Sequence, residues 1–151
     1  MIYYRNDVRR SGVDGRALKS TAQRLLAAAN ESGSSLSLTL VDDTAIRTLN
    51  REHRGKDRAT DVLSFPLLDE NNVSPERMLG DVVISVETAR RQAAEYDAPL
   101  KRELERLLIH GILHVLGHDH EQTTDRNAME SEERRLAGAI GMPWPYAGAA
   151  G

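Results

Sequence analysis

The chain has 151 residues, a formal net charge of −3 and no cysteine. This length fits one domain with a core of its own, and the absence of cysteine excludes disulfides and thiolate metal sites. No apolar run approaches the roughly 20 residues of a membrane-spanning helix. The first residues, MIYYRNDVRR, lack the apolar segment of a signal peptide, so we expect a cytoplasmic protein.

The first half of the chain predicts strands that alternate with helices. Leucines and alanines recur at helical spacing in residues 16–30, whereas leucine alternates with serine and threonine in residues 36–41, as in a strand with one buried face. Asp42 and Asp43 are both candidates for the N-cap of the next helix. The predicted elements are a strand at 2–5, a helix at 16–30, a strand at 36–41, a helix that runs toward Arg51, and a strand at 61–65 that ends before Pro66.

The second half begins with a polar segment at residues 68–79 and continues with one strand and three helices. These are a strand at 80–85, a helix at 86–96, a buried helix that begins near Pro99, and a last helix at 124–140. This order predicts an α+β fold, with a small mixed four-stranded sheet and helices packed mainly on one side. We expect one domain over residues 1–141 and a loose tail over 142–151, which is rich in glycine and proline.

Histidines mark the end of the buried helix, in the segment LIHGILHVLGHDH from Leu108 to His120. His110 and His114 are four residues apart, so their rings lie on one face of the helix and can reach a single ion. A histidine in a dry helix needs a partner for each ring nitrogen, and a metal ion supplies one. The segment therefore predicts a metal site.

The third ligand of this site must come from the residues around the end of the helix. In a continuous helix His118 would lie roughly 12 Å from His110, too far for one zinc ion with bonds of about 2.0 to 2.1 Å. Gly117 can adopt the left-handed conformation that ends a helix and turns the chain. We expect His120 to be the third ligand of one zinc ion, with His118 as second choice and Asp119 as a hydrogen-bonding partner of a ligand.

Three neutral imidazoles leave zinc its full charge and an open coordination position, which is typical of a catalytic site and of metal-assisted hydrolysis. The HxxxHxxGxxH spacing matches the metzincin peptidases, but Gly111 stands where those enzymes carry the glutamate base. This departure disfavours a peptidase. Met129 could lie beneath the metal, although core packing is the simpler interpretation. Asp81 is left without an assigned role.

Three separated blocks resemble the signatures of the YbeY family, which comprises metal-dependent bacterial endoribonucleases of ribosomal RNA maturation. They are RGKDRATDVLSFP from Arg54, LGDVVIS from Leu79 and HGILHVLGHDH from His110. Ala59 and Val115 replace a proline and a leucine that are usual in the family. The resemblance implies a zincin-like fold, one zinc ion on His110, His114 and His120, and no organic cofactor.

The resemblance also implies a function. The chain would cleave single-stranded RNA as a zinc-dependent endoribonuclease, in 16S rRNA 3′ end maturation and ribosome quality control, with the small ribosomal subunit and its assembly factors as partners. Arg54 occupies the position of the family's functional arginine, and its planar fork could hold a phosphate. Lys56 and Arg58 could follow the RNA backbone or could be solvated loop charges.

One alternative remains, a metal-stabilised ribosome-assembly protein with little nuclease activity. It is suggested by the few aromatic residues, one Phe, one Trp and four Tyr, because single-stranded RNA is commonly held by stacking on such rings. The sequence also does not choose between water and the RNA 2′-OH as nucleophile, and imidazole ligands accept metals other than zinc.

Overall fold

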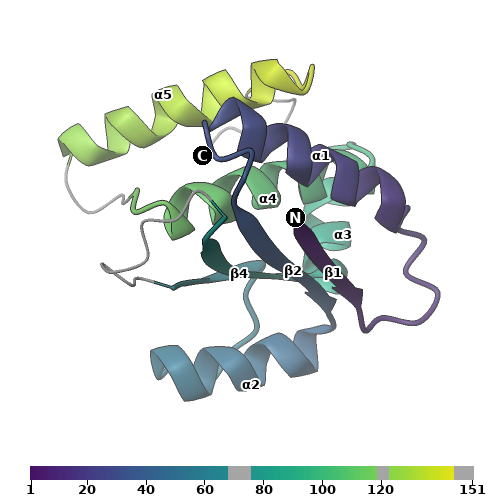
Figure 1. Ribbon diagram of the computed structural model, residues 1–151. Helices are drawn as coiled ribbons and strands as arrows, with labels where there is room; N and C mark the ends of the chain where they lie inside the picture. The colour runs from purple at the N-terminus through teal and green to yellow at the C-terminus, as the bar shows by residue number, and fades with distance from the viewer. Residues whose placement is uncertain (68–75, 119–122, 145–151) are drawn as a thin grey trace.

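The computed structural model describes residues 1–67, 76–118 and 123–144. Within them the chain forms four strands and five helices in the predicted order (Figure 1). The elements are β1 (Ile2–Asn6), α1 (Gly15–Ala28), β2 (Ser35–Val41), α2 (Asp43–Arg54), β3 (Val62–Pro66), β4 (Met78–Ser85), α3 (Val86–Glu95), α4 (Leu100–Val115) and α5 (Thr123–Ala139). No helix among these residues is long and apolar enough to cross a membrane.

The strands form one mixed sheet in the order β1-β2-β4-β3. The first three strands run parallel, and β3 pairs antiparallel with β4 at the end of the sheet. In Figure 1, α1, α4 and α5 lie above the sheet and α2 lies alone below it. The predicted α+β architecture, with helices mainly on one side, is confirmed.

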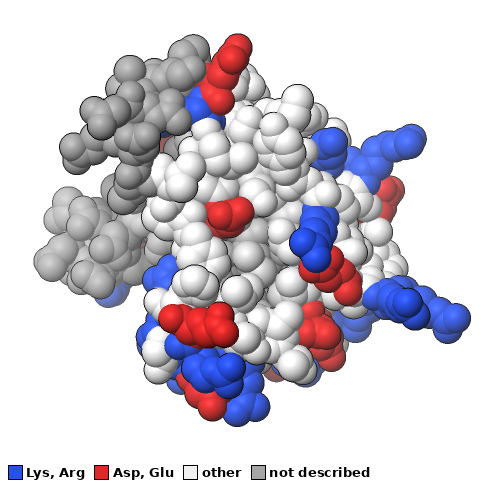
Figure 2. Space-filling view, turned by 60° about the horizontal axis from the view of Figure 1, so that its bottom comes forward, with Lys and Arg blue, Asp and Glu red and all other residues white. Residues whose placement is uncertain are grey.

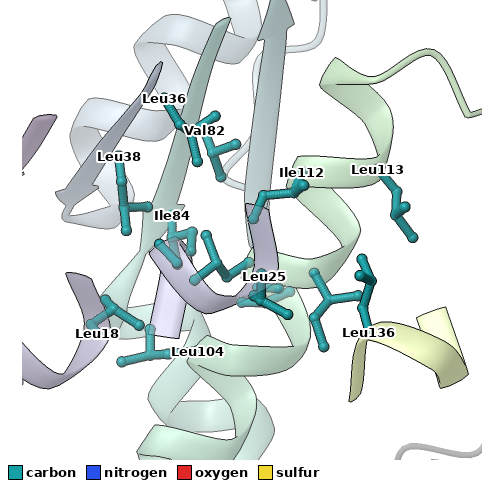
Figure 3. Packing of buried hydrophobic residues seen from close by; sticks show 14 of the residues in the cluster. Leu18, Leu25, Leu36, Leu38, Val82, Ile84, Leu104, Ile112, Leu113 and Leu136 are labelled. Atoms are coloured by element: carbon teal, nitrogen blue, oxygen red, sulfur yellow. The ribbon is translucent and has the colours of Figure 1, made fainter. Parts of the chain in front are cut away.

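The main core fills the space between the sheet and the helices above it (Figure 3). Leu104, Ile112 and Leu113 of α4 pack there against Leu38 of β2 and Val82 of β4, so α4 is buried as predicted. Burial of these apolar side chains is the main stabilisation of the helix, at about 25 cal/mol for each Å² removed from water.

Residues of α5 and of the segment after it also belong to the core or its margin. Met129 has none of its surface exposed and lies in the main core, which supports the packing interpretation of this methionine. Met142 is also buried, and Trp144 packs against the same core. The packed chain therefore extends past residue 141, whereas residues 145–151 of the expected tail lie outside the described part.

The strand β4 begins at Met78, two residues before the predicted start at Gly80. A glycine normally weakens a strand, which made Gly80 look like a boundary. In the structure Gly80 has a φ of 151°, and a Cβ there would lie 2.3 Å from the carbonyl oxygen of Phe65. The glycine is thus inside the strand because the neighbouring backbone approaches it closely.

The N-termini of α2 and α3 cap each other, which fixes the direction of α2. Asp42 is the N-cap of α2, one of the two predicted candidates. The Asp43 carboxylate accepts hydrogen bonds of 2.6 Å from Ser85 Oγ and Thr88 Oγ1, and Glu87 Oε1 accepts one of 2.8 Å from Asp43 N. Because the carboxylates satisfy donors at the start of both helices, the two helices are joined as one unit.

The helix α4 approaches β4 very closely at Gly111. A Cβ at this position would lie 2.6 Å from Val82 Cγ1 and 3.4 Å from Ser64 Oγ, and the Ser64 hydroxyl donates a 3.3 Å hydrogen bond to Gly111 O. A larger side chain fits only if the Val82 side chain, the helix or the strand shifts. The glutamate base of a metzincin at residue 111 would thus clash with Val82 as it is packed here.

Replacing Asp43 by asparagine should make stability less dependent on pH. Burial raises the pKa of Asp43, but hydrogen bonds from Ser85, Thr88 and Arg91 outweigh it and hold the pKa below its usual value. The stabilisation is present above the unfolded-state pKa and is lost as pH falls through the lower folded-state pKa. We expect Asp43→Asn to lower the free energy of unfolding by about 1 kcal/mol at neutral pH and by less in acid, measured by urea denaturation.

The control is Asp97→Asn, since Asp97 has a φ of 55° that asparagine tolerates. It should retain the pH dependence of the unmodified chain. If Asp43→Asn also retains it, the carboxylate is not the group that titrates with unfolding.

Replacing Gly111 by alanine should destabilise the protein through overpacking, by about 1 to 3 kcal/mol. The matched control is Gly138→Ala in α5, where no atom lies within 4 Å of the added Cβ. That control should be stabilised by about 0.5 to 1 kcal/mol through helix propensity. Thermal unfolding compares the two variants, and the double variant Gly111→Ala/Val82→Ala should recover part of the loss. A stable Gly111→Ala variant would show that the contact is not tight in solution.

Candidate functional site

A cleft of about 630 Å³ lies between β3 and the C-terminal half of α4. His110, His114 and His118 line it from α4 and the turn that follows. Arg54, Lys56 and Arg58 line it from the end of α2 and the loop before β3. The structure thus brings together five of the six predicted site residues, together with His118, the second choice for the third metal ligand.

The rings of His110 and His114 converge in this cleft. Their Nε2 atoms are 3.1 Å apart, the ring centroids are 4.5 Å apart, and both side chains are half-buried. Two tetrahedral zinc ligands with bonds of about 2.05 Å have their nitrogens roughly 3.3 Å apart. The observed separation of 3.1 Å is close to this value, and it also allows a hydrogen bond between the two rings.

The third predicted ligand, His120, lies in residues 119–122, outside the described part of the chain. Within the described residues, no group of three or more His, Cys, Asp or Glu side chains could hold a metal. The roles of His110, His114 and His120 as a ligand set stay a prediction.

The chain turns at Gly117 as predicted. The helix α4 ends at Val115, Gly117 has a φ of 98°, and the N–H of His118 donates a 3.0 Å hydrogen bond to Leu113 O. This is the bonding pattern of a glycine-terminated helix. It takes the chain off the helix axis, and His118 faces the same cleft as the two histidines before it.

Arg54 is the last residue of α2, and its side chain is held in place at the edge of β3. Its Nη2 donates a 2.7 Å hydrogen bond to Ser64 O, and its guanidinium carbon lies 5.8 Å from the centre of the Phe65 ring. His53 meets the same ring edge to face, with centroids 5.1 Å apart. The contacts of Arg54 with Ser64 O and Phe65 fix an otherwise exposed arginine beside the cleft.

The loop after α2 is organised by Asn50, which sequence reasoning missed. Asn50 is 4% exposed, its side-chain Nδ2 donates to Arg58 O at 2.9 Å, and its backbone carbonyl accepts from Lys56 N at 3.3 Å. The sequence did carry a signal for this role. Asn50 lies four residues after Ile46, on the same face of α2, and next to Leu49. Such a buried amide usually bonds to a nearby backbone.

The acid of the basic loop is neutralised outside the cleft. Asp57 accepts hydrogen bonds of 2.8 and 3.3 Å from Arg47, and these bonds lower its pKa. No ion pair involves Arg54, Lys56 or Arg58 among the residues that the structure describes.

The described lining of the cleft also contains no carboxylate. The described lining of the cleft is thus positively charged and attracts anions, although the net charge of the chain is −3. Figure 2 turns the α2 side toward the viewer, and there basic and acidic side chains are intermixed.

Comparisons with known proteins bear on the family and the fold of this chain. The family model described as Endoribonuclease YbeY matches residues 3–141. The solution structure of TM1509 from Thermotoga maritima has the same fold, with a TM-score of 0.59 and 26% identity, over 93% of this chain and 92% of that one.

Three relatives named endoribonuclease YbeY are similar in sequence. The protein from Myxococcus xanthus (strain DK1622) is 53% identical over 84% of this chain and 44% of its own length. The protein from Anaeromyxobacter sp. (strain Fw109-5) is 48% identical over 84% of this chain and 65% of its own length. The chain thus spans less than two thirds of these two relatives. The protein from Desulfitobacterium hafniense (strain Y51) is 41% identical over 88% of both chains. The family match and these identities show that the chain belongs to the endoribonuclease YbeY family.

Proposed function

We propose that this protein is a zinc-dependent endoribonuclease that cleaves single-stranded RNA. It acts in the cytoplasm on ribosomal RNA, including the 3′ end of 16S rRNA, and in ribosome quality control, together with the small ribosomal subunit. The observation that carries the proposal is one cleft that combines the converging histidines with three cations and, in its described lining, no carboxylate. This combination suits a phosphodiester, which brings negative charge to a metal site.

His110 and His114 would hold the zinc ion, with His120 as the third ligand. A bound zinc ion would polarise a phosphoryl oxygen or activate a nucleophile. Arg54 would bind a nonbridging oxygen with the part of its guanidinium that is not bonded to Ser64 O. Since that bond already orders the side chain, little conformational entropy is lost when a phosphate binds.

The free edge of β3 argues against a peptide as substrate. A peptide would add to an edge strand through alternating backbone donors and acceptors. Here the Val62 N–H donates to Asp61 Oδ1 at 2.8 Å, the Ser64 carbonyl accepts from Arg54 at 2.7 Å, and Pro66 has no N–H. The missing base at Gly111 and this covered edge both disfavour a peptidase.

A ribosome-assembly protein with little nuclease activity is the second candidate. The described lining of the cleft contains no Phe, Tyr or Trp side chain on which a base could stack, which favours weak binding of free RNA. Purified protein that has a full complement of metal, binds single-stranded RNA and leaves it intact would establish this candidate. An end-group assay of any product separates the nucleophiles, because a 2′,3′-cyclic phosphate requires attack by the RNA 2′-OH.

Replacing His114 by alanine should remove the metal and the activity together. Loss of metal stabilisation worth several kcal/mol would lower kcat/KM by about 1000-fold. The measurements are RNA cleavage and zinc content by mass spectrometry. The control is His53→Ala, because His53 is exposed on α2 and does not line the cleft, so this variant should keep both properties. If the His114→Ala variant contains no zinc but cleaves RNA at the rate of the unmodified protein, the nuclease does not depend on the metal.

Replacing Arg54 by lysine should lower kcat/KM for RNA by about 10- to 100-fold at unchanged zinc content. A lysine ammonium group cannot bind Ser64 O and at the same time offer a planar pair of donors to a phosphate. The control is Arg51→Lys, because Arg51 lies one turn from the site and is 4.0 Å from Asp57 in an exposed ion pair. It should cleave RNA as the unmodified protein does. Equal rates for Arg54→Lys and the unmodified protein would show that charge alone suffices at residue 54.

A further inference from the structure

The strand β3 presents every second residue to its free edge. Asp61 O accepts a 2.9 Å hydrogen bond from Ser85 N, and Leu67 N donates one of 2.9 Å to Leu79 O. In an antiparallel pair, alternate residues form the ladder, so the odd-numbered residues of β3 face β4. Ser64 therefore directs its backbone N–H and carbonyl away from β4, toward the free edge.

The two backbone groups of Ser64 differ in what they contact. The carbonyl accepts the hydrogen bond from Arg54 Nη2, whereas the N–H has no hydrogen-bond acceptor among the described residues. The neighbouring Val62 N–H is satisfied by Asp61 Oδ1, and Pro66 carries none. The amide of Ser64 is thus the one uncommitted donor that the described edge of β3 offers to the cleft.

We propose that the Ser64 N–H and the Arg54 guanidinium form a two-donor anion site that binds a phosphoryl oxygen of an RNA strand in the cleft. The hydrogen bond to Ser64 O places Arg54 beside the amide of the same residue. It also covers the acceptor that would otherwise repel a phosphate. A backbone donor fixed in a sheet needs no reorganisation to bind an anion, which makes it effective where negative charge develops.

The surroundings of this two-donor anion site favour a phosphate over a neutral peptide carbonyl. Lys56 and Arg58 line the same cleft without ion pairs among the described residues, and the described lining holds no carboxylate. The hydroxyl of Ser64 is turned inward to Gly111 O, so the amide and not the side chain is the group presented to a ligand. This inference rests on the proposed function, because RNA is the source of the phosphate.

NMR spectroscopy of the isotope-labelled, zinc-loaded chain tests the site directly. A short 2′-O-methyl oligoribonucleotide should shift the Ser64 amide proton downfield and slow its exchange, and should leave the Val62 amide unchanged. The same oligonucleotide with uncharged methylphosphonate linkages should have no such effect. Binding of the charged oligonucleotide without a change at the Ser64 amide overturns the proposal. The proposal also fails if the Ser64 amide responds to an unlabelled tetrapeptide and not to the oligonucleotide.

Inorganic phosphate separates this proposal from the proposed function. A Ser64 response to phosphate in a protein that neither binds nor cleaves RNA supports the anion site and rejects the nuclease. RNA cleavage without any response at Ser64 rejects the anion site and keeps the nuclease.

A backbone substitution gives the kinetic test. Replacing Ser64 by its α-hydroxy analogue changes the amide to an ester, which removes the N–H and keeps the side chain. The matched control is the α-hydroxy analogue at Val62, whose N–H is bonded to Asp61. Each ester weakens one ladder carbonyl, and the ester at Val62 also loses the hydrogen bond to Asp61, so the control carries at least the structural cost of the ester at Ser64. We expect the ester at Ser64 to lower kcat/KM by about 10- to 100-fold at unchanged zinc content, as for a lost hydrogen bond to a charged group. Equal rates for the two esters would overturn the proposal.

Discussion

The close contact of α4 with β4 at Gly111 is the constraint on which the candidate site depends. Because no Cβ separates the helix from Val82, α4 lies low over the sheet, next to β3. His110 is one residue before the contact and His114 is three residues after it, so the histidines face the edge strand across a short gap. A helix lifted by a larger side chain would widen this cleft and separate the histidines from Arg54. The packing of the core and the geometry of the site thus depend on the same glycine.

Across the cleft from α4, the end of α2 and the loop before β3 are held by polar contacts instead of apolar burial. Arg54 is fixed by Ser64 O, and the loop that follows is fixed by the buried amide of Asn50. Arg47 pairs with Asp57 and leaves the other cations of the loop to face the cleft. A positive cleft on an acidic protein therefore results from where the acids are neutralised, and the total charge does not reveal it.

Much of the fold and part of the site could be predicted because the signals were local. Periodicity located the strands and helices, and Gly117 marked the end of α4, as its φ confirms. The pairing of His110 with His114 followed from helical spacing alone. The start of β4 was misplaced at Gly80, because a glycine that admits a neighbouring backbone looks the same in sequence as one that ends a strand. The roles of Asn50 and of Gly111 in packing were missed for a related reason. Asn50 bonds to Arg58 O and Gly111 contacts Val82, and neither contact follows from local sequence.

The covered edge of β3 has a consequence for the behaviour of the protein at high concentration. An edge strand with free donors and acceptors is a template for another strand, and natural proteins protect such edges against aggregation. Here Asp61, Arg54 and Pro66 remove three of the groups that a second strand would need. The arrangement that prepares this edge for an anion therefore also keeps neighbouring molecules from joining their sheets. Selection for solubility and selection for the ligand would act on the same side chains, so a change at Arg54 affects both.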